Sequence, residues 1–189
     1  MKTKLIGSLA VTAVMWLVFL ADFIFPGEFT NFGILPRTFR GLFGIILAPF
    51  LHAGLWHIVS NTLPILVLTF VLSAFYEKIA VKVWALSALI GGALVWLISW
   101  RNAIHVGMSG VIFSLLGFLL ASGIFRKSLK SIIIGIIIFL LYGGALWGVI
   151  PSNPYVSWEG HLFGLLTGIF LAYIFRKEEL KFKTDESFE

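Results

Sequence analysis

Long apolar runs separated by short charged connections dominate the pattern of this chain. Six such runs cover residues 5–25, 55–76, 81–99, 105–125, 131–150 and 157–175. About 20 mostly apolar residues are needed for a helix to cross a bilayer, and a helix satisfies its own backbone polar groups where no water is present. The pattern predicts an all-α polytopic membrane protein, built as a bundle of six transmembrane helices.

The stretch between the first and second runs does not fit the spanning pattern. It contains Pro26, Pro36, Arg37 and Arg40, and its apolar part covers only residues 41–51. An apolar segment of that length is too short to cross and is typical of a segment that lies in the interface or enters the membrane partway. We therefore expect a long first loop that is partly embedded in the membrane.

The first apolar run has a second interpretation as a signal peptide, because Lys2 and Lys4 precede it. The run is long for the apolar region of a signal peptide, and no clear Ala-x-Ala site follows it. The pattern favours a retained helix. We expect residues 1–177 to form the membrane domain and residues 178–189 to form a polar cytoplasmic tail with alternating charges.

Composition agrees with the hydrophobic pattern. The 189 residues are 59% hydrophobic and 12% charged, and the mean hydropathy is +1.01. A soluble domain averages about 25% charged residues, and one of this size could not bury so much apolar surface. The chain has no cysteine, which excludes disulfides, iron–sulfur clusters and thiol catalysis.

Basic residues are distributed unevenly between the two ends of the predicted bundle. All but three of the 14 Lys and Arg residues lie near the termini or in the second-to-third and fourth-to-fifth connections; the exceptions are Arg37, Arg40 and Arg101. The positive-inside rule then predicts cytoplasmic termini and places Ser109 and His161 toward the non-cytoplasmic side. Because membrane topology explains the net charge of +5, we expect no nucleic-acid partner.

Two polar residues share one face of the second predicted helix. Polar residues inside a span are costly and are candidates for function. His57 and Asn61 are spaced i, i+4, and both carry N–H donors that could stabilise an oxyanion. The pair could equally bond a neighbouring helix. A metal site would need further ligands, and no carboxylate lies at helical spacing to join them.

Glycine-rich motifs begin two later helices. Gly107-Met108-Ser109-Gly110 opens the fourth run, and His161 lies in the sixth run among glycines at positions 160, 164 and 168. Glycines spaced by four residues let two helices approach closely, and we expect Gly110 and Gly117 to form the matching face. That approach would bring the Ser109 hydroxyl near the His161 ring, which could take its proton.

The residues supply no acidic member for a catalytic triad. Glu159 should face away from His161 on the helix, and Asp22 lies at the end of another span. Phe113, one turn after Ser109, is placed to orient the imidazole instead. The residues by themselves leave open whether Ser109 and His161 form a catalytic dyad or simply pack.

With these motifs in order, the chain resembles the rhomboid family of intramembrane serine proteases. The matching pieces are His57-x-x-x-Asn61, Gly107-Met108-Ser109-Gly110 and Gly160-His161-x-x-Gly164, together with His52 five residues before His57. The six-span layout, the long first loop and Glu77-Lys78 at the end of the second run also fit. Each motif alone is weak, but three in the right order on the right helices are specific, and the resemblance covers nearly the whole membrane region.

The resemblance implies a role for each matching position. Ser109 would be the nucleophile and His161 the general base, while His57, Asn61 and the backbone around Gly107 to Ser109 would stabilise the oxyanion. Members of the family cut transmembrane protein substrates near the helix end and need no metal, ATP or other cofactor. The implied function is an intramembrane serine endopeptidase, working in a lipid bilayer, for which a bacterial plasma membrane is expected.

Supporting residues and departures from the family pattern complete this interpretation. His52 would tie the first loop to the second helix, and Gly110 and Gly164 would support the close packing. Phe113 stands where the family commonly has a tyrosine, so it can stack on the catalytic histidine but cannot donate a hydrogen bond. The first loop lacks the usual Trp-Arg pair, and residues 37–40 are its nearest equivalent.

Two other functions and one unassigned residue stay open. A catalytically inactive rhomboid-like protein could bind membrane helices in the same cavity without reacting at Ser109. A small transporter would need charged residues inside its spans or repeated halves, and the pattern has neither. We expect His105, in the loop before Ser109, to be an interfacial polar residue, with a proton or substrate contact as the alternative.

Overall fold

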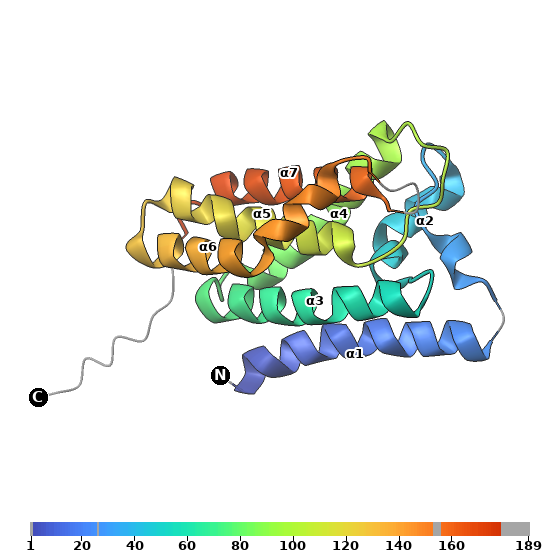
Figure 1. Ribbon diagram of the computed structural model, residues 1–189, viewed down its shortest axis with the longest axis horizontal. Helices are drawn as coiled ribbons and strands as arrows, with labels where there is room; N and C mark the ends of the chain where they lie inside the picture. The colour runs from blue at the N-terminus through green and yellow to red at the C-terminus, as the bar shows by residue number, and fades with distance from the viewer. Residues whose placement is uncertain (1, 26, 153–155, 179–189) are drawn as a thin grey trace, which may run out of the picture.

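The computed structural model describes residues 2–25, 27–152 and 156–178. Within them the chain folds into seven α-helices, most of which run side by side along the long axis (Figure 1). Their bounds are α1 Lys2–Ile24, α2 Phe39–Leu47, α3 Leu55–Phe75, α4 Ala80–Ile98, α5 Ser109–Arg126, α6 Leu129–Tyr142 and α7 Trp158–Ile174. Short 3-10 helices connect them: η1 Phe29–Phe32, η2 Ala48–Phe50 and η3 Gly143–Val149. The predicted all-α bundle is confirmed.

The helices account for the six predicted spans. In the described part of the chain, five helices are long and apolar enough to cross a membrane: α1, α3, α4, α5, and α6 taken together with η3. The sixth span is α7, a shorter apolar helix of 17 residues. With so many apolar helices in one small chain, the protein is an integral membrane protein.

Two predicted span boundaries differ from the structure. The fourth apolar run begins at residue 105, but α5 begins only at Ser109, which leaves His105 in the preceding loop, as expected. The backbone of His105 instead pairs with that of Ile34, with both N–H···O distances at 2.9 Å, and this extended segment cannot join the helix. The fifth span tightens into η3 after Tyr142, where two consecutive glycines, Gly143 and Gly144, weaken the α-helix.

The first loop folds against the end of α4. The N-cap residue Thr38 accepts from the Gly41 N–H at 3.1 Å and begins α2. The Trp96 indole donates to the Thr38 carbonyl at 2.8 Å, and the Arg37 N–H donates to the Trp96 carbonyl at 3.0 Å. The nine residues of α2 are too short to cross a bilayer, as the sequence predicts for this loop.

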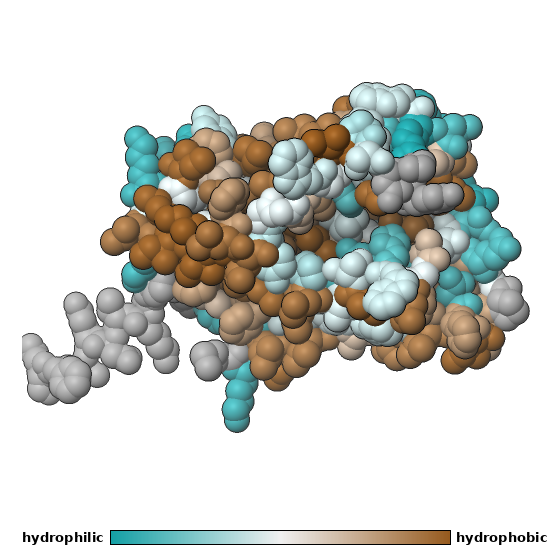
Figure 2. Space-filling model, viewed as in Figure 1, coloured by the Kyte–Doolittle hydropathy of each residue, from teal (hydrophilic) through white to brown (hydrophobic). Residues whose placement is uncertain are grey.

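Helix α5 forms the centre of the bundle. It packs on α3, α4, α6 and most extensively on α7, and most of its side chains are buried. In contrast, α6 exposes large apolar side chains such as Ile136, Phe139 and Leu140, and brown hydrophobic residues gather over α6 in Figure 2. An apolar exterior around a packed centre suits a lipid environment, in which acyl chains contact these side chains.

The close contact between α5 and α7 requires glycine at three positions, Gly117, Gly164 and Gly168. A Cβ at Gly164 or Gly168 of α7 would collide with backbone carbonyls of α5, and a Cβ at Gly117 would lie 2.5 Å from a carbonyl of α7. At Gly110 the nearest atom would be 3.6 Å away, which is ordinary van der Waals contact. Gly110 thus lies against α7, where its own carbonyl is the atom that a Cβ at Gly164 would meet, but the space at Gly110 does not itself demand a glycine.

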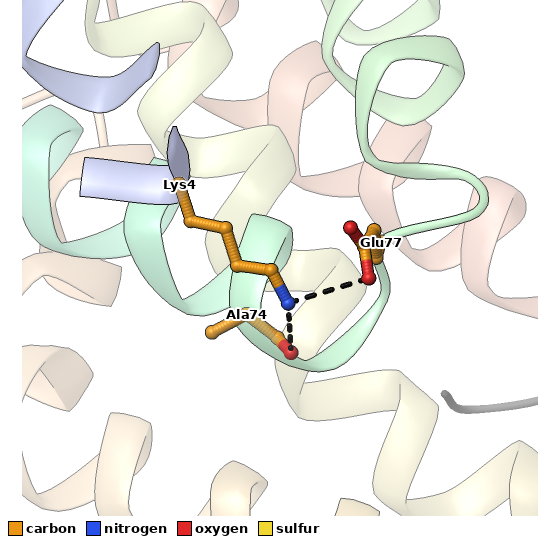
Figure 3. A network of polar contacts seen from close by, with 3 residues as sticks. All are labelled: Lys4, Ala74 and Glu77. Carbon is orange, nitrogen blue, oxygen red and sulfur yellow. Dashed lines mark hydrogen bonds and ion pairs between the residues drawn. The ribbon is translucent and has the colours of Figure 1, made fainter. Parts of the chain in front are cut away.

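The bundle has two chemically different ends. We call the end where α3, α5 and α7 begin the site end, and the opposite end, which carries most of the Lys and Arg residues, the basic end. At the basic end Lys4 of α1 donates to the Ala74 carbonyl at 3.4 Å and pairs with the Glu77 carboxylate at 3.4 Å (Figure 3). The predicted polar tail lies, from residue 179 on, outside the described residues.

Candidate active site

Ser109 and His161 meet at the site end of the α5–α7 contact. Ser109 is the first residue of α5, and His161 lies in the first turn of α7. The Ser109 Oγ is 2.9 Å from the His161 Nε2, within hydrogen-bond distance. The His161 side chain is buried. The two residues that the sequence singles out are thus brought into direct contact by the close packing of their helices.

A backbone carbonyl and an aromatic ring orient the His161 imidazole. The Nδ1 atom is 2.9 Å from the carbonyl oxygen of Gly148 in η3. A carbonyl can only accept, so Nδ1 carries the proton and Nε2 is left to accept from the Ser109 hydroxyl. The ring also stacks on Phe113, with centroids 4.1 Å apart and planes 6° from parallel.

Gly148 is the member of this site that sequence reasoning missed. Any residue offers a backbone carbonyl, so the hydrogen bond has no signature in the sequence. The available signal was the glycine itself, because a Cβ at Gly148 would lie 3.0 Å from both the His161 Nδ1 and the Phe113 Cζ. A glycine late in the fifth apolar run therefore marks the place where the ring comes close to the chain.

The donors His57 and Asn61 line the opposite wall of the site. The Ala53 N–H points to the His57 Nδ1 at 3.4 Å, which leaves the proton on Nε2. That Nε2 lies against Gly107, only 2.5 Å from where a Cβ would be. The buried Asn61 amide donates one N–H to the His57 carbonyl at 2.7 Å. Its second N–H is the one that could serve a substrate.

The backbone of the nucleophile segment, residues 105–109, corrects one predicted role. Gly107 adopts a positive φ of 112°, a conformation that favours glycine. Its N–H donates to the Ala48 carbonyl at 2.9 Å, so the expectation that Gly107 supplies an oxyanion donor was wrong. Ser109 begins α5, and amides in the first turn of a helix have no acceptor within the helix. The Ser109 N–H is the backbone donor available at this position.

His52 holds the nucleophile segment as well as the first loop. Its Nδ1 is 3.3 Å from the Phe50 carbonyl, and its Nε2 lies 3.5 Å from the Met108 N–H. The ring meets the His57 ring edge-on at a centroid distance of 5.0 Å. Burial, and secondly the neighbouring His57, lowers the pKa of His52 to about 4. A neutral imidazole can accept at Nε2, which fits the contact with Met108.

A cavity of about 750 Å³ opens onto these residues. Its wall includes Ser109, His161, His57 and Asn61, and it extends between α3 and η3. In the described part of the chain, α3 and α6 do not pack closely against each other. The site is therefore a hollow at one end of the bundle, with a side on which two helices are apart.

The acidic residues and His105 lie outside the dyad. Glu159 is fully buried but accepts from the Trp100 N–H at 3.2 Å, and Asp22 accepts from the Phe29 N–H at 2.8 Å. Among the described residues no carboxylate hydrogen-bonds to His161, as the sequence indicates. His105 is only 6% exposed and lines the cavity; an interfacial role and a proton or substrate contact both stay predictions.

Comparison with known proteins gives one consistent answer. A model of the Rhomboid domain matches residues 40–178. An uncharacterised protein of Mycobacterium tuberculosis is 37% identical over 181 residues, which cover 92% of this chain and 75% of that protein. The Bacillus subtilis protein YdcA, named as a candidate rhomboid protease, is 32% identical over 175 residues, 88% of this chain and 85% of its own. A mitochondrial rhomboid-like protein of Arabidopsis thaliana is 27% identical over 130 residues, 69% of this chain and 42% of its own. With its motifs, its helix order and these matches together, the chain belongs to the rhomboid family.

Proposed function

We propose that this protein is an intramembrane serine endopeptidase that cleaves transmembrane protein substrates. The observation that carries the proposal is the 2.9 Å contact between the Ser109 Oγ and the His161 Nε2, with the opposite ring nitrogen held by the Gly148 carbonyl. A serine is a weak nucleophile until a base takes its proton. Family membership supports the same assignment.

The first step is attack of Ser109 on the scissile carbonyl. His161 Nε2 takes the hydroxyl proton as the Oγ–C bond forms. The imidazolium that results is stabilised by its Nδ1–H···O bond to Gly148 and by the stacked Phe113 ring. The carbonyl oxygen of Gly148 carries partial negative charge, so it does electrostatically part of what a carboxylate does in a triad.

The oxyanion formed in this step needs hydrogen-bond donors. His57 Nε2–H, the second amide N–H of Asn61 and the backbone N–H of Ser109 are the groups that supply them. Removing one such donor typically costs about 10²–10³ in rate. The collapse of the tetrahedral intermediate then passes the proton from His161 to the leaving amine, and water hydrolyses the acyl-enzyme with His161 again as base.

The substrate segment reaches the dyad from the side, between α3 and α6. These helices do not pack closely within the described chain, and the cavity extends toward that side. A peptide bond inside a helix is shielded by its own hydrogen bonds, so the segment must unwind before attack. Gly or Pro near the scissile bond makes unwinding less costly.

The proposed orientation follows from the charges at the two ends. Lys and Arg residues concentrated at the basic end favour its location in the cytoplasm, with both termini and the tail of residues 178–189 there. The site end then faces the non-cytoplasmic side, from which water reaches the dyad. A bacterial plasma membrane fits the bacterial relatives.

The decisive experiment uses the full chain in liposomes with a transmembrane test substrate. Ser109→Ala should abolish cleavage and labelling by a fluorophosphonate, whereas Ser122→Ala, at a buried serine near the other end of α5, should retain both. Undiminished cleavage by Ser109→Ala would overturn the proposal. A folded wild-type chain that neither cleaves nor reacts would favour the inactive, helix-binding alternative.

A further inference from the structure

A second serine–histidine pair joins the same two segments as the dyad. The His105 Nδ1 lies 2.6 Å from the Ser157 Oγ, and the partners are separated by 52 residues, as Ser109 and His161 are. Each member lies four residues before a member of the dyad. The roles are exchanged, since here the histidine is on the nucleophile segment and the serine precedes α7.

The His105 imidazole is held by several elements at once. Its side chain is buried, and its Nε2 is 3.2 Å from the Ser99 Oγ at the end of α4. Its backbone pairs with Ile34 of the first loop. The ring thus ties the nucleophile segment to α4, to the first loop and, through Ser157, to the start of α7.

Ser157 is the N-cap residue of α7. Its Oγ accepts from the Gly160 N–H at 3.2 Å, so its hydroxyl proton is free to point at the His105 Nδ1. Burial lowers the pKa of His105, with Glu159 raising it and Arg101 lowering it to lesser extents. A neutral imidazole can accept from Ser157 at Nδ1 and donate to Ser99 at Nε2.

Glu159 adds a second attachment for the first turn of α7. Its Oε1 accepts from the backbone N–H groups of Trp100 and Arg101 at 3.2 and 3.4 Å. These bonds fasten α7 to the end of α4 but do not reach the nucleophile segment. Among the described residues, the bond from His105 to Ser157 is the side-chain hydrogen bond, besides the dyad itself, that links residues 105–109 directly to the start of α7.

We propose that His105 is a positioning residue for the dyad, whose bond to Ser157 sets the register between the nucleophile segment and the first turn of α7. The proposal rests on the proposed protease function. Residues 105–108 precede α5 and form no helix of their own, with Gly107 at a φ of 112°, so the packing of α5 on α7 does not by itself hold this segment against α7. Without the bond, the two segments can shift by a fraction of an ångström without disrupting either helix. Displacement of about 1 Å at reacting groups costs on the order of 10²-fold in rate.

The test compares His105→Leu, Ser157→Ala and the double variant in liposomes, with kcat, KM and the rate of fluorophosphonate labelling as readouts. Each single variant should lower kcat and labelling by about 10- to 100-fold. KM should change less than about threefold, because His105 and Ser157 form only a small part of the cavity wall. The double variant should be slowed by clearly less than the product of the two single effects, since both single variants remove the bond between His105 and Ser157. His105→Gln and Ser157→Thr keep hydrogen-bonding groups and should recover most of the lost rate.

A matched control separates positioning from general stability. Thr62→Val removes the 3.0 Å bond from the Trp16 indole between α1 and α3, and it should lower the melting temperature without changing kcat. If His105→Leu behaves like Thr62→Val, or if the two single effects multiply in the double variant, the positioning proposal is overturned.

A measurement that needs no activity can test the positioning role even if the proposed protease function fails. The ring ¹⁵N resonances of His161 report its bonds to Ser109 and Gly148. They should change in His105→Leu and stay unchanged in Thr62→Val. If the wild type proves inactive, unchanged His161 resonances in His105→Leu overturn the positioning role, and changed ones support it.

Discussion

Individual histidines at the site end occupy different environments, although the chain has only four of them. His161 bonds the Ser109 hydroxyl and the Gly148 carbonyl. His57 lines the cavity. His52 contacts the backbone of the nucleophile segment, and His105, which belongs to that segment, bonds Ser157 at the start of α7. His161 and His57 therefore lie where the proposed chemistry needs them, whereas His52 and His105 hold neighbouring segments in place.

The buried His52 predicts how stability depends on pH. Its pKa is about 4 in the folded chain and about 6.5 when exposed. Between these values the unfolded chain binds a proton that the folded chain does not. Its contribution is therefore fully present above about pH 6.5 and is lost as the pH falls, by up to about 1.4 kcal/mol per pH unit. Thermal unfolding in detergent between about pH 4.5 and 8 measures this slope.

The control for this prediction is His52→Asn, which has no titrating ring. The variant should be less stable than the wild type at pH 8, because the contacts with Phe50 and Met108 are weakened. Its stability should fall less steeply toward acid pH. An equal slope in both proteins would assign the acid sensitivity to other groups.

At the scale of elements, η3 connects the fifth span to the dyad. The 3-10 segment follows α6 directly, and its Gly148 carbonyl holds the His161 ring. The side of the cavity proposed for substrate access is thus adjacent to the group that orients the base. Movement of α6 relative to α3 would reach His161 through this one short segment.

Gly148→Ala tests the role of η3. The new Cβ would lie 3.0 Å from both the His161 Nδ1 and the Phe113 Cζ, so the ring must shift from its stacked position. We expect kcat to fall by roughly 10- to 100-fold, with the fold retained. Gly144→Ala is the matched control, because a Cβ there meets nothing within 4 Å. Equal activity in the two variants would contradict the role assigned to Gly148.

At the scale of the whole molecule, charge and apolar surface divide the bundle along its long axis. Most basic residues lie at one end and the site at the other, and hydrophobic residues gather over α6 (Figure 2). With this arrangement, the proposed peptidase chemistry would take place near one surface of a bilayer rather than at its centre. Water can then reach the dyad without crossing the hydrocarbon core.

The proposed orientation predicts which end is accessible from outside a bacterial cell. The chain has no cysteine, so single-cysteine variants can be labelled without background. Asn102→Cys, at an exposed position of the site end, should react with a membrane-impermeant maleimide in intact cells. Lys127→Cys, exposed at the basic end, should react only after permeabilisation. The opposite pattern would reverse the orientation.

The sequence by itself determined the membrane class, the helix order and most residues of the candidate site. Apolar runs of about 20 residues form helices in lipid, because the backbone there must satisfy its own hydrogen bonds. Ser109, His161, His57 and Asn61 stood out because polar groups in such runs are costly. Side-chain identity and helical spacing were sufficient for these inferences.

Tertiary structure alone decided which backbone groups and which buried contacts complete the site. The carbonyl of Gly148 and the occupied N–H of Gly107 are chemically like those of any other residue, so only their positions give them a role. The burial of His105 likewise depends on segments that are distant in the chain, including Ser157. Spacing along a helix predicts neighbours within one element, whereas contacts between loops and helix ends arise only when the whole bundle packs.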